Sequence, residues 1–82
     1  MYATYCLKLE GGNYYVGRST QLKERLTKHF KYGASAWTKL HKPVEVVCVV
    51  QGDHEVPMYR YAERKYGKEH VRGAYRTAVN AK

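Results

Sequence analysis

The sequence predicts a mixed α/β (α+β) fold, in which a three-stranded, mostly antiparallel sheet is flanked by helices in the order β-β-α-β-α. Three observations predict this class. Alternating apolar residues open the chain and resume after two glycines, two later segments have helical spacing, and a run of β-branched residues separates them. The chain has 82 residues, enough for one core, so we expect a single domain over residues 1–82.

The first two strands are expected to form a β-hairpin over residues 3–17. Tyr5, Leu7 and Leu9 alternate with Cys6 and Lys8, which is the period of a strand with two different faces. The sequence EGGN follows and contains two glycines that tolerate positive φ, and YYV then returns to an extended pattern. This order predicts two neighbouring antiparallel strands joined by a tight turn.

A helix is expected next, at about residues 21–31, with Ser19 or Thr20 as its N-cap. Its predicted buried stripe consists of three apolar residues spaced by four, Leu22, Leu26 and Phe30. The following segment, YGASAWTKLHKP, has no clear period and is expected to be irregular.

The third strand is expected in the segment VEVVCVV, residues 44–50. Its β-branched residues occupy both faces, which is typical of a central strand covered on both sides. A second helix then begins at Asp53 or Glu55, has Pro57 in its first turn and ends at Gly67. A short helical turn is expected near residues 72–79.

The chain is strongly basic, with fifteen Lys and Arg against seven Asp and Glu and a formal net charge of +8. Such a charge favours polyanions, and nine tyrosines supply rings that pack on sugars or bases, so we expect nucleic acid as a partner. Composition alone leaves an alternative open, in which the charges are a solvated face and the tyrosines fill the core.

The two cysteines belong to no metal or redox motif. Cys6 and Cys48 lie in apolar segments without CxxC spacing or partner histidines, so we expect both to be reduced and buried. The sequence has no apolar run of about 18 residues and no apolar signal segment at its N-terminus. We therefore expect no membrane partner and a cytoplasmic protein.

Two cations of the first helix lie beside its apolar stripe instead of opposite to it. On a helical wheel that starts at Leu22, Arg25 and His29 both border the stripe. They are candidates for a functional site. In the structural alternative, Arg25 lays its aliphatic part over the sheet and His29 is a half-buried histidine with satisfied hydrogen bonds.

The second helix has a carboxylate in the corresponding place, because Glu63 lies at the margin of the apolar face that contains Met58 and Ala62. One carboxylate, together with substrate phosphate oxygens and waters, can hold Mg²⁺. Glu63 is therefore a candidate metal ligand, and pairing with a neighbouring arginine is the alternative.

These polar residues could converge on one patch, with Tyr5 and Tyr15 from the strands and Arg25, His29 and Glu63 from the helices. Phosphodiester hydrolysis needs a base for the attacking water, positive charge for the transition state and a metal at the leaving oxygen. Nearby Arg25 and His29 would favour the phenolate form of a tyrosine, and His29 could accept its proton.

At this point the residues resemble the GIY-YIG nuclease family over nearly the whole chain. The family's second signature triplet appears as YVG, residues 15–17, with Arg25 ten residues after the tyrosine and His29 four residues further on. Glu63 in AERKYG stands where the family has its metal-binding glutamate. The segment YGKEHVRGA is similar to the YG…VRGG ending of a subgroup of small members, many of them viral.

The resemblance implies a role for each residue. Tyr5 and Tyr15 would position and activate the attacking water. Arg25 would bind the scissile phosphate, and His29 would assist the proton transfer. Glu63 would hold one Mg²⁺ or Mn²⁺ ion per active site.

The chain departs from the family pattern in its first triplet, which reads ATY over residues 3–5 where the family has Gly-Ile-Tyr; the tyrosine is kept. Arg18 stands where other members carry a lysine, and we expect it to contact phosphate. Many members also have a late asparagine at the site, for which Asn80 is the candidate in this chain.

The predicted function is a stand-alone, divalent-metal-dependent endonuclease that hydrolyses DNA phosphodiester bonds. Because nearly all of the chain is used for the catalytic fold, we expect low intrinsic sequence specificity. The alternatives are a non-catalytic nucleic-acid-binding domain of the same fold and an RNA-directed nuclease. One active site cuts one strand, so double-strand cleavage would require a homodimer or two visits, and a partner protein could supply targeting.

Overall fold

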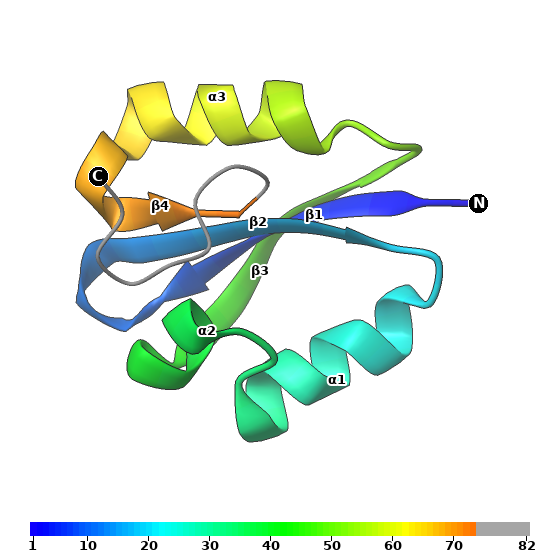
Figure 1. Ribbon diagram of the computed structural model, residues 1–82, viewed down its shortest axis with the longest axis horizontal. Coiled ribbons are helices and arrows are strands. Elements are labelled where there is room, and N and C mark those ends of the chain that lie inside the picture. Colours follow the sequence, from blue (N-terminus) through cyan, green and yellow to red (C-terminus); the bar gives the residue numbers. More distant parts are fainter. Residues whose placement is uncertain (74–82) are drawn as a thin grey trace.

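The computed structural model describes residues 1–73 and has the expected mixed α+β fold (Figure 1). Two strands open the chain, β1 (Ala3–Leu9) and β2 (Asn13–Ser19), and a 3₁₀ turn joins them at Glu10–Gly12. The later elements are α1 (Leu22–Tyr32), α2 (Ala36–Leu40), β3 (Pro43–Gln51), α3 (Glu55–Tyr66), a 3₁₀ turn (Lys68–His70) and β4 (Val71–Arg72).

The sheet has four strands within the described residues, in the order β3-β1-β2-β4. β1 pairs antiparallel with both β2 and β3, as expected, and β4 adds a short parallel pairing to β2. The sequence pattern does not predict β4, because two residues are too few to show a strand period.

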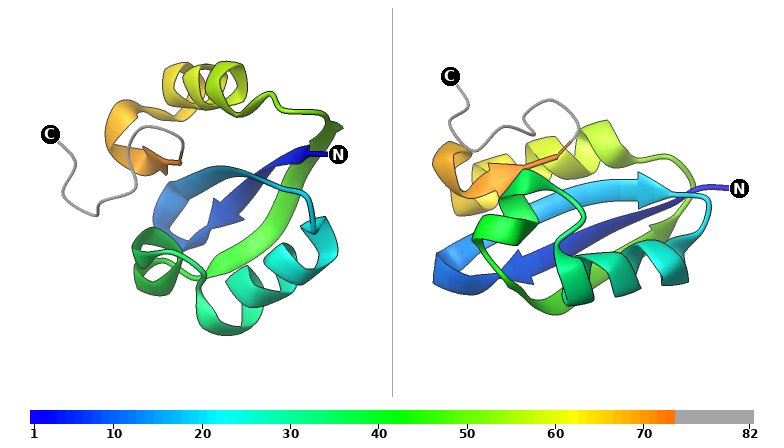
Figure 2. Two further views of the ribbon diagram at one scale, coloured as in Figure 1. Left: turned by 45° about the vertical axis from the view of Figure 1, so that its right-hand side comes forward. Right: turned by 60° about the horizontal axis from the view of Figure 1, so that its bottom comes forward.

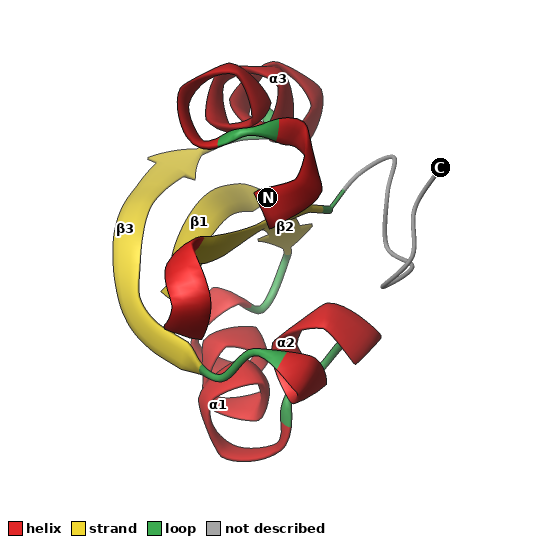
Figure 3. Cartoon of the chain, turned by 90° about the vertical axis from the view of Figure 1, so that its left-hand side faces the viewer, coloured by secondary structure: helices red, strands yellow, loops and turns green. Residues whose placement is uncertain are grey.

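Helices cover the sheet from both sides. Figure 3 shows α3 on one side of the curved sheet and α1 and α2 on the other, and Figure 2 shows these layers from two further directions. Two cores result. The core under α1 and α2 contains Tyr5, Leu7, Leu9, Tyr15 and Trp37. The core under α3 contains Cys6, Val16, Tyr59, Ala62 and Val71.

The hairpin agrees with the sequence pattern. Gly11 and Gly12 both have positive φ, 73° and 74°. Glycine tolerates this conformation, which is why the two glycines predict a turn here. The alternation of β1 is also confirmed, because Tyr5 and Leu7 belong to one core and Cys6 to the other.

The prediction that residues 44–50 form a buried central strand is wrong. β3 is an edge strand, and five of its valines are more than a third exposed: Val44, Val46, Val47, Val49 and Val50. Valine on both faces identifies a strand but does not say how many neighbours cover it. For the same reason Cys48 is exposed, whereas Cys6 is buried as expected, and both thiols are free.

The segment expected to be irregular contains the short helix α2. Ser35 Oγ accepts a hydrogen bond from Thr38 N–H at 3.2 Å, and the Ser35 N–H donates to Thr38 Oγ1 at 3.1 Å, which together form a capping box. Five residues are too few to show a helical period. Trp37 anchors α2 in the core, where its Nε1–H donates to Tyr14 O at 3.0 Å.

The predicted cap and stripe of α1 need correction. Gln21 is the N-cap residue and makes no side-chain cap hydrogen bond; Ser19 Oγ accepts from Gln21 N–H before the helix begins. Phe30 is exposed, and His29 on the adjacent side of the helix is fully buried. The buried face of α1 is therefore turned toward the polar residues that border the stripe.

Helix α3 begins at Glu55 and ends before Gly67, as expected. Arg72 lies in β4, and the helical turn expected near residues 72–79 otherwise falls outside the described residues, as does Asn80. Within residues 1–73, no helix has the length and apolar composition needed to cross a membrane.

The exposure of β3 leads to a test with two Val→Thr variants, which keep the side-chain shape and change one methyl to a hydroxyl. Val49 is 45% exposed on β3 and Val16 is 0% exposed on β2. We expect Val49→Thr to change the free energy of unfolding by less than about 1 kcal/mol, and Val16→Thr to cost about 1–3 kcal/mol because it buries a hydroxyl. Urea unfolding measures both; equal losses would contradict the edge position of β3.

Candidate active site

Two tyrosines from neighbouring strands meet on the face of the sheet that α1 covers. Tyr5 on β1 is opposite Gly17 on β2, and Tyr15 precedes that glycine by two residues, so all three face the same side. A Cβ atom on Gly17 would lie 2.6 Å from Tyr5 Oη and 2.9 Å from Tyr15 Cε2. Glycine at this position is therefore what lets both rings approach the strand.

The rings of the two tyrosines and His29 form one buried cluster. The ring centroids are 6.3 Å apart for Tyr5 and Tyr15, 5.6 Å for Tyr5 and His29, and 4.9 Å for Tyr15 and His29. Tyr5 and His29 are 0% exposed and Tyr15 is 6% exposed. Three residues predicted as site residues from the sequence are thus brought together.

His29 is held by hydrogen bonds at both ring nitrogens. Nε2 lies 2.9 Å from Tyr5 Oη, and Nδ1 lies 3.1 Å from Thr38 Oγ1 on α2. Burial, and then the nearby charge of Arg25, lower the pKa of His29 from 6.5 to about 4. The imidazole is therefore neutral at pH 7 and keeps one nitrogen able to accept a proton.

The lowered pKa of His29 predicts a loss of stability in mild acid. The unfolded chain binds the proton near pH 6.5 and the folded chain only near pH 4, so stability is full above pH 6.5 and falls as the pH drops toward 4. The shift corresponds to about 3 kcal/mol. We expect chemical denaturation between pH 7 and 4.5 to show this loss for the parent and a smaller loss for His29→Gln. The same carboxylates titrate in both proteins, so the difference between the two losses belongs to His29. Equal pH dependence of the two proteins would contradict it.

Arg25 lies beside both hydroxyls, within hydrogen-bonding reach of Tyr5 and Tyr15. Its positive charge and hydrogen bonds lower the pKa of each phenol, but burial raises it more. The pKa of Tyr5 is raised to about 12, and that of Tyr15 is also raised. Arg25 therefore favours the phenolate as expected, but desolvation, which the expectation left out, outweighs it in the free protein.

One atom of Arg25 has no partner. Among the described residues, its Nε is a buried side-chain nitrogen without a hydrogen bond. An unsatisfied donor of a charged group costs roughly 1–3 kcal/mol or more. An anion bound beside the tyrosine hydroxyls would supply the missing acceptor.

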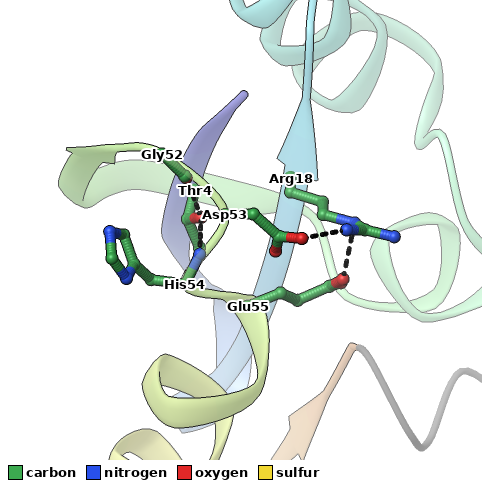
Figure 4. A network of polar contacts seen from close by, with 6 residues as sticks. All are labelled: Thr4, Arg18, Gly52, Asp53, His54 and Glu55. Atoms are coloured by element: carbon green, nitrogen blue, oxygen red, sulfur yellow. Dashed lines mark hydrogen bonds and ion pairs between the residues drawn. The ribbon is translucent and has the colours of Figure 1, made fainter. Parts of the chain in front are cut away.

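A group of charges lies at the end of β2, where α3 begins. Figure 4 shows Arg18 paired with the carboxylates of both Asp53 and Glu55. Arg18 Nε lies 3.2 Å from Glu55 Oε1, and the guanidinium also stacks 4.8 Å from the ring centroid of Tyr2. Arg18, the expected phosphate contact, is thus paired with carboxylates in this structure.

The start of α3 is fixed to β1 by Thr4, a buried residue of the first triplet. Thr4 Oγ1 donates to Gly52 O at 2.7 Å and accepts from His54 N–H at 2.8 Å (Figure 4). Gly52 N–H also donates to Tyr2 O at 2.6 Å. These contacts hold the loop before α3 against β1, one residue before Tyr5, and thereby set the position of Glu55.

Glu55 is the carboxylate of α3 that acts electrostatically on the tyrosines. Its side chain is 17% exposed, and burial raises its pKa against the opposing effect of Arg18. Its negative charge raises the pKa of both Tyr5 and Tyr15. Residue type and spacing do not single out Glu55, because an acidic residue in the first helical turn already has an explanation in the helix dipole.

Glu63, the expected metal ligand, lies elsewhere on the same helix. It stands eight positions after Glu55, which is about 12 Å along the helix axis. Tyr66 stacks on Tyr14 with ring centroids 3.6 Å apart, which places this half of α3 over the beginning of β2 instead of its end. The structure thus brings Tyr5, Tyr15, Arg25 and His29 together, with Arg18 and Glu55 nearby, and places Glu63 at the other end of α3.

The donor set at the start of α3 fits a divalent cation. No group of three or more His, Cys, Asp or Glu side chains suited to a metal occurs within residues 1–73. Mg²⁺ does not need one, because it binds through one or two carboxylates and completes its shell with substrate phosphate and water. Asp53 and Glu55 already share one cation, the guanidinium of Arg18.

A curved, mostly antiparallel sheet between helices thus carries buried tyrosines, an arginine and a neutral histidine together on one face. The chain matches the family model described as the GIY-YIG catalytic domain over residues 1–76, and it therefore belongs to this family. GIY-YIG domains are usually nucleases and generally depend on a divalent metal. Comparisons with curated proteins and with solved structures gave no match.

Proposed function

We propose that the chain is a divalent-metal-dependent endonuclease that hydrolyses DNA phosphodiester bonds with low intrinsic sequence specificity. The observation that carries the proposal is Arg25, whose buried Nε lacks an acceptor beside the hydroxyls of Tyr5 and Tyr15. A phosphodiester provides an anionic oxygen for this donor and an electrophilic phosphorus near the hydroxyls. Low specificity is supported because phosphate contacts carry no base information.

In the proposed reaction a water attacks phosphorus, passes its proton to Tyr5 Oη, and the Tyr5 proton moves to His29 Nε2, 2.9 Å away. The pKa values of about 12 and about 4 keep this proton on Tyr5 at rest. The transfer therefore takes place during the attack. Negative charge then moves from the attacking oxygen to the equatorial phosphate oxygens, where Arg25 stabilises it. Tyr15 positions the water from the other side.

Glu55, with Asp53, would hold the ion, in place of the glutamate Glu63 that the sequence suggests. When bound, Mg²⁺ or Mn²⁺ supplies positive charge at the leaving oxygen. Glu55 contributes a half-buried carboxylate directed across the end of β2, and Arg18 is then released toward a neighbouring phosphate. The leaving alkoxide takes its proton from solvent after the P–O bond breaks.

The first test of the proposal is incubation of the purified chain with supercoiled plasmid, single-stranded DNA and RNA, with Mg²⁺, with Mn²⁺ and with a chelator. We expect metal-dependent nicking of the plasmid. Arg25→Gln should abolish it, and Arg60→Gln, which removes an exposed charge of α3, should not. Binding without cleavage would favour the non-catalytic alternative, and cleavage of RNA alone would favour an RNA-directed nuclease.

The order in which nicked and linear plasmid appear also indicates whether two active sites act together. One active site cuts one strand at a time, so we expect nicked circles to precede linear DNA. Linear product at the earliest times would indicate two sites acting together, in a homodimer or with a partner protein. Size-exclusion chromatography of the same preparation, with and without DNA, distinguishes a dimer from two independent visits.

A further inference from the structure

Behind His29, on the side away from Tyr5, lies a hydroxyl that the proposed reaction has not yet used. Thr38 is 1% exposed and belongs to the first turn of α2. Its Oγ1 lies 3.1 Å from His29 Nδ1, and His29 Nε2 lies 2.9 Å from Tyr5 Oη. Thr38, His29 and Tyr5 thus form a continuous buried chain of three side chains from α2, α1 and β1.

With its proton on Ser35, Thr38 offers an acceptor to the imidazole. Thr38 Oγ1 accepts the Ser35 N–H at 3.1 Å, and its single proton has two acceptors on Ser35, the carbonyl oxygen at 3.3 Å and Oγ at 3.1 Å. A hydroxyl oxygen has two acceptor sites, so one remains for His29 Nδ1–H. The neutral imidazole carries one proton, and with that proton at Nδ1, Nε2 is left as an acceptor facing Tyr5 Oη.

We propose that Thr38 is a positioning residue for the nuclease reaction, and that it holds His29 in the Nδ1–H tautomer so that Nε2 can take the proton of Tyr5. The proposal rests on the proposed function for its catalytic consequence. In the opposite tautomer Nε2 carries a hydrogen and cannot accept another proton. Thr38 also continues to accept from Nδ1–H after His29 becomes an imidazolium, so the product of the transfer keeps both hydrogen bonds.

The effect of removing the Thr38 hydroxyl on the tautomer of His29 follows from the same count of donors and acceptors. Valine in its place has nearly the same shape but no acceptor, so a hydrogen at Nδ1 would be buried without a partner. Moving that hydrogen to Nε2 restores a hydrogen bond, because Tyr5 Oη can accept it. Thr38→Val therefore favours the tautomer that cannot serve as the base.

The test compares three variants with the parent by tautomer and by cleavage rate. Thr38→Val removes the acceptor, Thr38→Ser keeps it, and Ser35→Ala weakens the same cap without removing the Thr38 hydroxyl. Long-range ¹H–¹⁵N correlation spectra of His29 at pH 7 distinguish protonated from unprotonated Nδ1 and Nε2 and need no activity. Plasmid nicking under excess substrate gives kcat.

We expect the parent, Thr38→Ser and Ser35→Ala to show the Nδ1–H tautomer and Thr38→Val the Nε2–H tautomer. The kcat of Thr38→Val should fall by on the order of 10²-fold, and that of the other two by less than about 5-fold. An Nε2–H tautomer in the parent overturns the proposal even if Thr38→Val does not fold. An equal loss of kcat in Ser35→Ala and Thr38→Val also overturns it, since the role would then be structural. If the parent has the Nδ1–H tautomer but cuts no nucleic acid, the proposed function fails and the positioning of His29 stands.

Discussion

Tyr5→Phe is expected to slow DNA cleavage by on the order of 10²-fold or more, because it deletes the oxygen that links the attacking water to His29. The ring remains, so its place in the core under α1 and α2 and its contact with Tyr15 persist. The hydroxyl lies 2.9 Å from His29 Nε2 and within hydrogen-bonding reach of Arg25, and its loss should also cost about 1–2 kcal/mol of stability. Tyr15→Phe should likewise slow cleavage while DNA binding persists.

Tyr59→Phe is the matched control. Tyr59 is 1% exposed, and its hydroxyl donates to Val71 O at 3.2 Å in the core under α3, on the other face of the sheet. Its loss of stability should resemble that of Tyr5→Phe, and its cleavage rate should equal that of the parent. Rates of nicking, measured well below each melting temperature, separate the two effects. If Tyr5→Phe and Tyr15→Phe both cut at the parental rate, the tyrosines are core residues and the mechanism is wrong.

The fold could be predicted where local patterns are long enough to have a period. The alternation of Tyr5, Leu7 and Leu9 predicts β1 and the face that each side chain occupies, and the two glycines predict the hairpin turn. The same reasoning cannot find β4 or α2, which have two and five residues. Both depend on tertiary contacts, such as the hydrogen bond from Trp37 to Tyr14.

The edge position of β3 could not be predicted, because the burial of a strand depends on which other elements pack beside it and over it. Valines on both faces are typical of a covered strand, but α3 packs over β1, β2 and β4 and leaves β3 at the edge. The burial of Phe30 was wrongly predicted for a related reason. An ideal wheel gives the apolar direction of α1, but the hydrogen bonds of His29 to Tyr5 and Thr38 turn the helix toward its polar margin.

The candidate site likewise contains residues that the sequence predicts and residues that it does not. Tyr5, Tyr15, Arg25 and His29 are identified from residue type and spacing, and the structure brings them together. The tautomer-setting partner Thr38 and the carboxylate Glu55 are not, because each has an ordinary local role, in a capping box and in a first helical turn. Only the packing of α2 and α3 around the sheet gives them a second role.

Glu55→Gln and Glu63→Gln form a matched pair that decides which carboxylate of α3 serves the metal. Each keeps the size of the side chain and removes one negative charge. Glu55 shares Arg18 with Asp53 and acts on the pKa of both site tyrosines, whereas Glu63 is about 12 Å further along the helix. We expect Glu55→Gln to lose metal-dependent cleavage and Glu63→Gln to keep it.

The reason for a loss in Glu55→Gln is specific to the ion. An amide oxygen is a neutral and weaker ligand for Mg²⁺ than a carboxylate, so the metal concentration needed for cleavage should rise strongly. Binding of DNA should be unchanged or tighter, because a negative charge near the phosphate is removed and Arg18 loses one of its two carboxylate partners. Measurement of melting temperature against Mn²⁺ concentration adds a readout without cleavage, in which the parent and Glu63→Gln should respond and Glu55→Gln should not. Loss of nicking and of the Mn²⁺ response in Glu63→Gln alone would falsify the assignment to Glu55 and restore the glutamate that the sequence suggests. Persistent nicking by both variants, with contaminating nuclease excluded, would show that neither carboxylate holds a required ion.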